Sequence, residues 1–182
     1  MHARGADATP AVDTPTLAGT VRTVMLRELR AARRMVEAYP DDAGPWTERP
    51  GLPNVGGTLV LHIAGNLQYF FGTVLGGTSY RRDRDAEFAR RGVPRAELLA
   101  ELDAAIAVVD RVLATLTPAV LDAEYPVPIL GRVVHTRDYL VHLAMHLAYH
   151  LGQLDYHRRV VTGSSAGVAA LAPAELPGRD AG

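Results

Sequence analysis

The stretch TRDYLVHLAMHLAYHLGQLDYHRRVVTG, residues 136–163, decides the fold of the chain. Its leucines recur at steps of three and four residues, which is the spacing of an α-helix with one buried face. Thr136 can cap the start of this helix, and Gly163 stands in the position typical of a helix end. The stretch therefore predicts one long helix that packs against others. Its predicted core face consists of Leu140, Leu143, Leu147, Leu151 and Leu154.

Three further segments show helical periodicity. The first, residues 17–38, stops before Tyr39-Pro40, because the residue preceding a proline disfavours helix. The second, residues 58–75, takes Thr58 as its N-cap and runs to the glycine pair 76–77. The third, residues 95–116, follows Pro94 and has the clearest period in the chain. Four long helices without a convincing set of strands predict an all-α fold, a four-helix bundle.

The predicted domain organisation is a single bundle, residues 16–163, between two flexible tails. Residues 1–15 and 164–182 are rich in small residues and proline and show no period. The length of 182 residues suits one domain with a real core. The Pro- and Gly-rich connection between the first two helices has Trp46 as its only strong apolar anchor, so we expect it to pack over one end of the bundle.

Composition excludes several classes of function. With 19 basic and 20 acidic residues the net charge is -1, which provides no positive field for nucleic acid or an anionic membrane surface. The chain has no cysteine, so it offers no disulfide, thiolate ligand or cysteine nucleophile. No signal peptide is recognisable, and no apolar run approaches the roughly 18 to 20 residues that span a bilayer. We therefore expect a cytoplasmic protein without a nucleic-acid or membrane partner.

The histidines of the last helix form one stripe. A step of four residues turns an α-helix by only about 40° and advances it by about 6 Å. His142, His146 and His150 therefore lie in line, and Gln153 follows in the same stripe. Because the leucine face is adjacent, these imidazoles are predicted to lie beside or within the packed interior.

A second polar stripe follows the helix predicted over residues 58–75, where His62, Asn66, Tyr69 and Thr73 share one face. Burying polar groups on an otherwise apolar helix costs free energy unless they bind one another, water or a metal. We therefore expect the two stripes to pair across the bundle. Asn66, Tyr69 and Gln153 are candidates to hydrogen-bond a substrate or water near the site, although helix-to-helix hydrogen bonds would equally explain Asn66 and Gln153.

The paired stripes predict a metal site. Two imidazoles at i and i+4 can bind one ion, and a third from a facing helix completes a half-shell with open positions. The predicted ligands are His62, His146 and His150, with His142 as the competitor because it stands at the same spacing from His146. Imidazole ligands favour a divalent transition metal, Zn²⁺ first and Ni²⁺, Fe²⁺ or Cu²⁺ as alternatives. A hydrogen-bonded layer of histidines without metal is the competing interpretation.

Other polar features are predicted to lie outside the site. His135 precedes the last helix, and His157 is expected near its exposed end beside two arginines. The run RRDRDAEFARR, residues 81–91, has charges of both signs and is interpreted as a solvated loop with about one helical turn, anchored to the bundle by Phe88. The alternative interpretation of this run is an anion-binding loop for a carboxylated thiol.

The motif HxxxHLGQ at residues 146–153 resembles the DinB/YfiT-like superfamily, whose usual form is HxxxHRGQ; Leu151 stands where the arginine is usual. HIAGN at 62–66, RDRDAEF at 82–88 and GQLDYHRR at 152–159 support this resemblance, which covers roughly residues 17–163. The resemblance implies an up-down-down-up bundle, frequent homodimerisation and a metal held by His62, His146 and His150. Relatives include transferases and isomerases that use bacillithiol or mycothiol.

Two functions are compatible with these features. In the first, the metal acts as a Lewis acid that activates water or a low-molecular-weight thiol, in a reaction of the transferase or hydrolase type. Any such thiol must be external because the chain lacks cysteine. In the alternative, the protein is a non-catalytic, dimeric bundle that the metal stabilises by crosslinking two helices.

Overall fold

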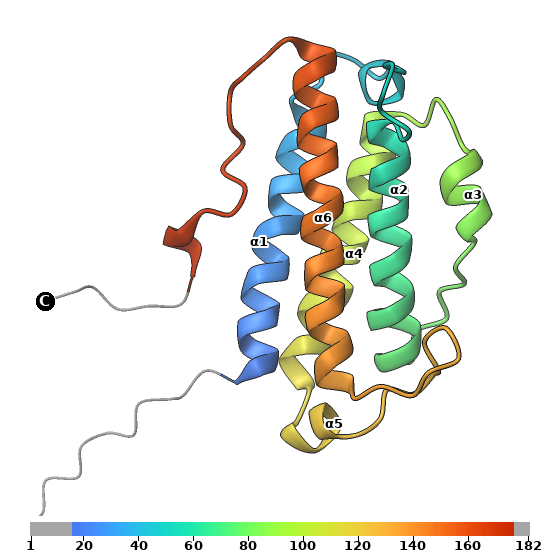
Figure 1. The fold of residues 1–182 in the computed structure, drawn as a ribbon, viewed down its shortest axis with the longest axis vertical. Helices are drawn as coiled ribbons and strands as arrows, with labels where there is room; N and C mark the ends of the chain where they lie inside the picture. The colour runs from blue at the N-terminus through green and yellow to red at the C-terminus, as the bar shows by residue number, and fades with distance from the viewer. Residues whose placement is uncertain (1–15, 177–182) are drawn as a thin grey trace, which may run out of the picture.

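The computed structural model describes residues 16–176, and four long helices lie side by side in it (Figure 1). They are α1 (Leu17–Glu37), α2 (Gly56–Leu67) with its continuation η2 (Gln68–Leu75), α4 (Arg95–Thr115) and α6 (Thr136–Thr162). In Figure 1 the chain rises through α1 and α6 and descends through α2 and α4. Every named element in the described range is helical, which confirms the predicted all-α class. The predicted N-terminal tail, residues 1–15, lies outside the described residues.

The core lies between these helices, since α1 and α2 each pack against both α4 and α6. Met25 and Leu29 of α1 are fully buried, as are Leu98 and Leu102 of α4. Burying an aliphatic side chain of this size contributes roughly 1.5–3 kcal/mol. The five leucines of the predicted core face of α6 are all buried, so the interpretation of residues 136–163 is confirmed. Gly163 ends α6 in the left-handed conformation, with φ of 68°.

Both threonines predicted as N-caps lie inside their helices. α2 begins earlier, with Val55 as the N-cap, and α6 begins at Thr136 itself, with His135 as the N-cap. The hydroxyls of Thr58 and Thr136 are buried, and neither has a hydrogen-bond partner among the described residues. The predicted caps are therefore wrong.

The first turn of α2 is closely packed against the connection that precedes it. A Cβ on Gly57 would lie 2.4 Å from Cζ2 of Trp46, and a Cβ on Gly56 would lie 2.4 Å from the hydroxyl of Tyr39. Trp46 is the last residue of the short helix η1 (Gly44–Trp46) and donates from Nε1 to the carbonyl of Val93 at 2.8 Å. The connection between α1 and α2 therefore packs over one end of the bundle, as the sequence predicts.

The second long helix is not α-helical along its whole predicted length. Beyond Leu67 it continues as a π-helix through Leu75, where the amide of Gly76 donates to the carbonyl of Phe71 at 2.8 Å. Within this π-helix the hydroxyl of Thr73 donates to the carbonyl of Tyr80 at 2.6 Å, and Thr73 does not line the cavity that His62 lines. The polar face of α2 therefore ends at Tyr69.

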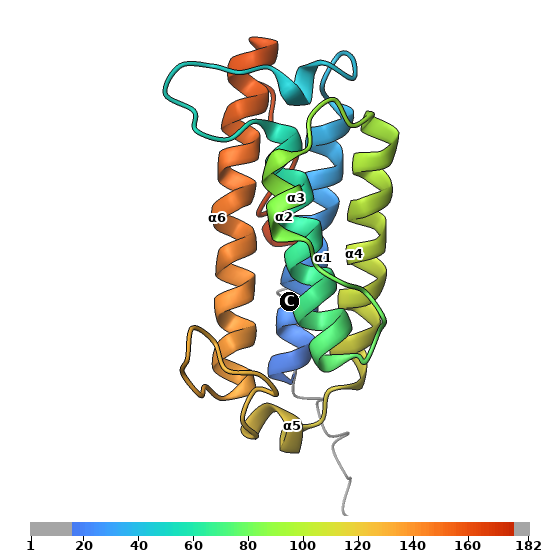
Figure 2. The same ribbon diagram turned by 90° about the vertical axis from the view of Figure 1, so that its right-hand side faces the viewer.

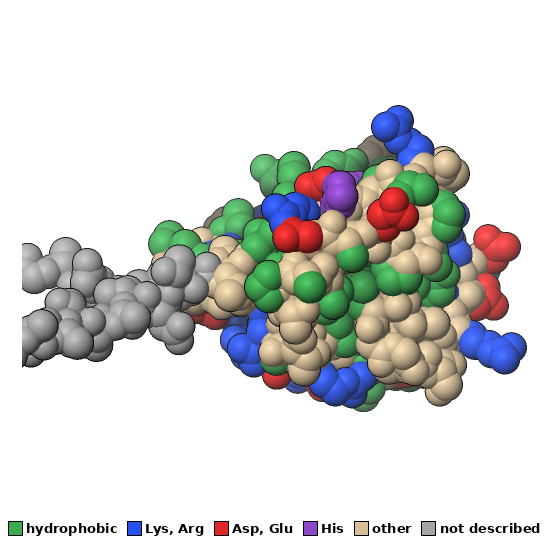
Figure 3. All heavy atoms as spheres, turned by 90° about the horizontal axis from the view of Figure 1, so that it is seen from below, with side chains coloured by type: hydrophobic (Ala, Val, Ile, Leu, Met, Phe, Trp, Pro, Cys, Tyr) green, Lys and Arg blue, Asp and Glu red, His purple; other side chains and the backbone are tan. Residues whose placement is uncertain are grey.

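Two short helices complete the fold. α3 (Arg84–Ala89) lies over the outer side of α2 in Figure 2, and α5 (Pro118–Asp122) begins the crossing from α4 to α6. Residues 123–135 then form a small irregular hairpin with two isolated bridges, Glu124 with His135 and Ile129 with Arg132. Figure 3 shows this end of the bundle, where hydrophobic side chains lie among charged side chains of both signs.

The segment that follows α6 returns alongside α1 (Figure 1). Arg34 of α1 donates from Nε to the carbonyl of Val168 at 2.7 Å, and Arg158 of α6 donates to the carbonyl of Ala166 at 2.7 Å. A single turn, η3 (Pro173–Glu175), ends the described part. These hydrogen bonds fix part of the segment predicted as a tail, and its residues 177–182 lie outside the described range.

Residues Gly56–Leu75 form a helix of 20 residues with the length and composition of a membrane span, since an 18-residue window within it has a mean hydropathy of 1.2. The expectation that no apolar run approaches that length is therefore wrong. However, 72% of the residues in this window are buried inside the bundle, which is typical of a helix in a protein core.

Candidate metal centre

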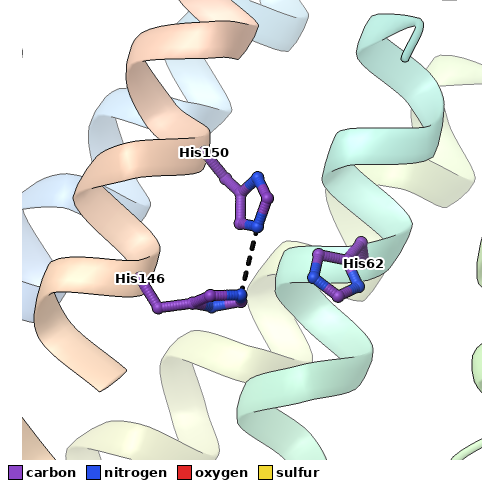
Figure 4. Close-up of side chains that lie close together, drawn as sticks. All are labelled: His62, His146 and His150. Carbon is purple, nitrogen blue, oxygen red and sulfur yellow. Dashed lines mark hydrogen bonds between the residues drawn. The ribbon is translucent and has the colours of Figure 1, made fainter. Parts of the chain in front are cut away.

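Three histidines from two helices converge between α2 and α6 (Figure 4). His62 projects from α2, and His146 and His150 project from successive turns of α6. One ring nitrogen from each lies within 4.8 Å of the other two. The Nε2 atoms of His146 and His150 are 3.1 Å apart, and the ring centroids of His62 and His150 are 4.8 Å apart. The structure thus brings together the three residues that the sequence predicts as ligands.

Gln153 fixes the orientation of the His150 ring. Nδ1 of His150 lies 2.7 Å from Oε1 of Gln153, and a carboxamide oxygen can only accept a hydrogen bond. Nδ1 therefore carries the proton of the neutral ring, which leaves the lone pair of Nε2 directed toward His146. Gln153, which the sequence places near the site, thus presents His150 as a metal ligand.

A carboxylate fixes the orientation of the His62 ring in the same way. Nδ1 of His62 donates to Oε2 of Glu87 at 2.9 Å, and Arg82 donates to both oxygens of that carboxylate at 2.7 and 2.9 Å. Burial alone would raise the pKa of Glu87, but the hydrogen bonds from Arg82 and His62 and the charge of Arg82 hold that pKa below its usual range. The ionised carboxylate keeps the proton on Nδ1 and leaves Nε2 of His62 available to a metal.

The contact with Glu87 corrects the prediction that residues 81–91 are a solvated loop outside the site. Asp83 caps α3 by accepting from the amide of Ala86 at 2.9 Å, and the helix then directs Glu87 toward α2. Gly65 makes room for it, because a Cβ at that position would lie 2.2 Å from Oε1 of Glu87. A glycine inside the apolar helix of HIAGN was the one sequence signal of this close approach.

The electrostatic environment keeps the α6 imidazoles neutral. Burial, together with the nearby charge of His150 and His62, lowers the pKa of His146 to about 4. Burial also lowers the pKa of His150, against the opposite effect of its hydrogen bond to Gln153. Neutral imidazole is the form that binds metals, so these two rings can act as ligands at neutral pH and below.

The remaining predicted residues lie around the three histidines. His142 is exposed and stacks between Tyr139 and His146, with ring centroids 5.5 and 6.2 Å away, and it is not part of the close group of ring nitrogens. Asn66 is buried one turn after His62, and its Oδ1 has no hydrogen-bond partner among residues 16–176. Tyr69 lines the same cavity as His62.

The three histidines open into a cleft with a volume of about 680 Å³. Its walls come from α2, α3, α6 and the hairpin before α6, and they combine aromatic with polar side chains. A cavity of this size lies within the range of roughly 300–1,000 Å³ that is typical of small-molecule sites. The nitrogens of the histidine group therefore face a space that a ligand can enter.

His157 is not exposed, in contrast to its predicted position. The side chain is 1% exposed; its Nε2 donates to the carbonyl of Thr47 at 2.9 Å, and its Nδ1 accepts from the hydroxyl of Tyr39 at 2.6 Å. Burial lowers its pKa. This histidine holds the connection between α1 and α2 against α6. His135 contacts the carbonyl of Asp122 at 2.9 Å; both histidines lie outside the metal-ligand group, as the sequence predicts.

The donor set fits a transition-metal ion. Two nitrogens bound to one tetrahedral Zn²⁺ at about 2.1 Å each lie about 3.4 Å apart. The α6 pair is close to this separation at 3.1 Å, and the ligand atoms of all three histidines lie within 4.8 Å of one another. All three donors are imidazole nitrogens, which suit Zn²⁺, Ni²⁺ or Fe²⁺ better than Mg²⁺ or Ca²⁺.

Comparison with known proteins identifies the family. No curated protein and no solved structure matches the chain. The family model of the DinB superfamily matches residues 9–154, which include α1 to α5, all three histidines of the close group and most of α6. The match spans most of the chain and agrees with the resemblance of its histidine motif, so the protein belongs to the DinB superfamily.

Proposed function

We propose that this chain is a metal-binding DinB protein in which His62, His146 and His150 hold one divalent ion, Zn²⁺ before Ni²⁺ or Fe²⁺. The observation that carries the proposal is the convergence of three ring nitrogens within 4.8 Å at a cleft. When bound, the ion supplies Lewis-acid chemistry that lowers the pKa of water or of an external thiol. We assign the site to a reaction of the transferase or hydrolase type on a small molecule.

The chain's own groups prepare the site for such a reaction. Gln153 and Glu87 hold protons on the Nδ1 atoms of His150 and His62, so that the Nε2 atoms of both rings remain free to bind an ion. Burial excludes water from His62 and from Glu87 behind it. Aromatic side chains on the cleft walls provide apolar surface for an organic substrate.

The metal-binding proposal is tested by comparing His150→Ala with His142→Ala. Purified wild-type protein should contain about one equivalent of metal and bind Zn²⁺ tightly in competition with a chromophoric chelator. His150→Ala should reduce the affinity by at least about a hundredfold, whereas His142→Ala should change it by no more than a few-fold, because His142 lies outside the close group. Equal losses in both variants would contradict the proposed ligand set.

The alternative function is a non-catalytic bundle that the metal only stabilises. The ion would join α2 to α6, so a chelator should lower the melting temperature under either function. The two functions differ in whether a substrate reacts in the cleft. Turnover of thioesters, amides or thiol-electrophile pairs, followed by mass spectrometry and lost in His150→Ala, would support the enzyme. A metal-dependent melting temperature without turnover across that panel would favour the structural role.

We also propose that the long helices form the up-down-down-up bundle of this superfamily and that the chain is a homodimer in the cytoplasm. The directions of the four helices support the proposed topology.

The proposed homodimer is supported by an exposed apolar stripe along α6, formed by Val141, Met145, Tyr149, Tyr156 and Val160. Met145→Glu should shift the protein to monomer in analytical ultracentrifugation, whereas Val120→Glu, on α5, should not.

A further inference from the structure

The cleft beside the three histidines has an unbalanced charge. Its lining includes Arg82 and Arg84 but no aspartate or glutamate. Arg82 is paired with Glu87, whereas Arg84 forms no ion pair with any carboxylate of residues 16–176. A divalent ion at the histidines would add positive charge to the same wall. Because like charge is concentrated in a concave surface, the cleft attracts anions.

The position of Arg84 relative to the histidines is set by Phe88. The guanidinium carbon of Arg84 lies 5.0 Å from the centroid of the Phe88 ring, and this ring lies 5.0 Å from the ring of His62. Stacking on an aromatic ring orients the guanidinium plane and leaves its N–H edge free to donate. Arg84 therefore presents hydrogen-bond donors to the cleft at about the length of a small molecule from the metal ligands.

A second observation indicates that a polar ligand enters this cleft. Asn66 lines the cavity, is only 7% exposed, and has no described partner for its Oδ1. A buried polar atom without a partner is costly, and a ligand that carries an N–H or O–H group would satisfy it. Beside Asn66, the rings of Tyr69, Phe70 and Tyr139 provide an apolar wall.

We infer that the cleft binds a small organic anion with a planar apolar body, whose carboxylate or phosphate group contacts Arg84 and whose body lies along the aromatic wall beside the histidines. The inference deepens the proposed function by naming its substrate class, and it rests on that function for the metal's share of the positive charge. The contact with Arg84 itself does not require a metal.

The test uses three probes with the same aryl body: para-trifluoromethylbenzoate, its neutral isostere para-trifluoromethylbenzamide, and para-trifluoromethylphenyl phosphate. Their dissociation constants are measured by fluorine NMR titration of the full chain, first metal-free and then loaded with Zn²⁺. In the metal-free protein both anions should bind roughly two- to fivefold more tightly than the amide, which is the contribution of one favourable ion pair at an exposed site. Arg84→Gln should remove most of this preference.

Arg81→Gln is the matched control. Arg81 is exposed on the same segment, carries the same charge and does not line the cleft, so its substitution should leave the preference intact. Equal affinities for acid and amide, equal effects of the two substitutions, or binding of none of the probes would overturn the inference. A protein that fails to bind Zn²⁺ yet keeps an Arg84-dependent anion preference would overturn the proposed metal function alone.

Discussion

Glu87 lies directly behind the candidate metal centre and is not one of its three histidines. Its carboxylate accepts from Nδ1 of His62 at 2.9 Å, so Glu87→Gln replaces an anionic acceptor by a neutral amide of the same shape. We expect the affinity for Zn²⁺ to fall by roughly 10- to 100-fold, because the partner of a ligating histidine fixes its ring and raises its basicity. Competition with a chromophoric chelator measures the change.

The control for this substitution is Glu97→Gln, which removes an exposed glutamate paired with Arg90 on the surface of the bundle. Its Zn²⁺ affinity should match that of the wild-type protein, because surface ion pairs contribute little. If Glu87→Gln also kept wild-type affinity, the hydrogen bond from His62 would have no part in metal binding.

Single residues differ in how far the sequence predicts them. His146 and His150 could be paired from sequence because four residues along one helix fix their relative position, and the facing polar stripe indicated His62. The contact between Glu87 and His62 could not be predicted, because the two residues are 25 positions apart and the irregular connection between their helices sets their relative position. The burial of His157 likewise depends on Thr47, 110 positions away.

At the scale of helices, α2 and α3 fit together through Gly65. In Gly65→Ala the new Cβ would come within 2.2 Å of Oε1 of Glu87, so this flexible side chain must move away from His62. We predict a loss of Zn²⁺ affinity of about tenfold, similar to that of Glu87→Gln. The free energy of unfolding should change by less than about 1 kcal/mol, since alanine favours the helix by a comparable amount.

Gly152→Ala is the matched control on α6. An added Cβ there has no atom within 4 Å, so the substitution should stabilise the protein by roughly 0.5–1 kcal/mol and leave metal affinity unchanged. Titration with Zn²⁺ and urea unfolding of both variants separate the two effects. If Gly65→Ala bound Zn²⁺ as tightly as Gly152→Ala, the displacement of Glu87 would have no effect on metal affinity.

Helix positions were predictable from periodicity, whereas helix starts were not. The period of apolar residues reports burial along a helix, and it located α1, α4 and α6 to within about two residues. The first turn of α2, which lies before the predicted start, packs instead against Trp46 through Gly57, a contact with the preceding connection that periodicity does not report. The π-helical turns after Leu67 also have no signal in a three- or four-residue spacing.

At the scale of the whole molecule, the histidines that folding buries wholly or in part make the free energy of unfolding depend on pH. The pKa of His146 is about 4 in the folded protein and 6.5 for an unperturbed histidine, so the unfolded chain binds more protons between these values. Stability is therefore lost as the pH falls through that window. The lowered pKa values of His150 and His157 act in the same direction.

We predict that the free energy of unfolding of the metal-free protein is on the order of 1–2 kcal/mol lower at pH 5 than at pH 7 through His146 alone. Urea unfolding at the two pH values measures the difference. His146→Gln should reduce it, whereas His142→Gln, which removes an exposed histidine of the same stripe, should not. Equal or greater stability at pH 5 would mean that the α6 imidazoles are not held neutral by burial, and the argument that they are ready to bind metal would fail with it.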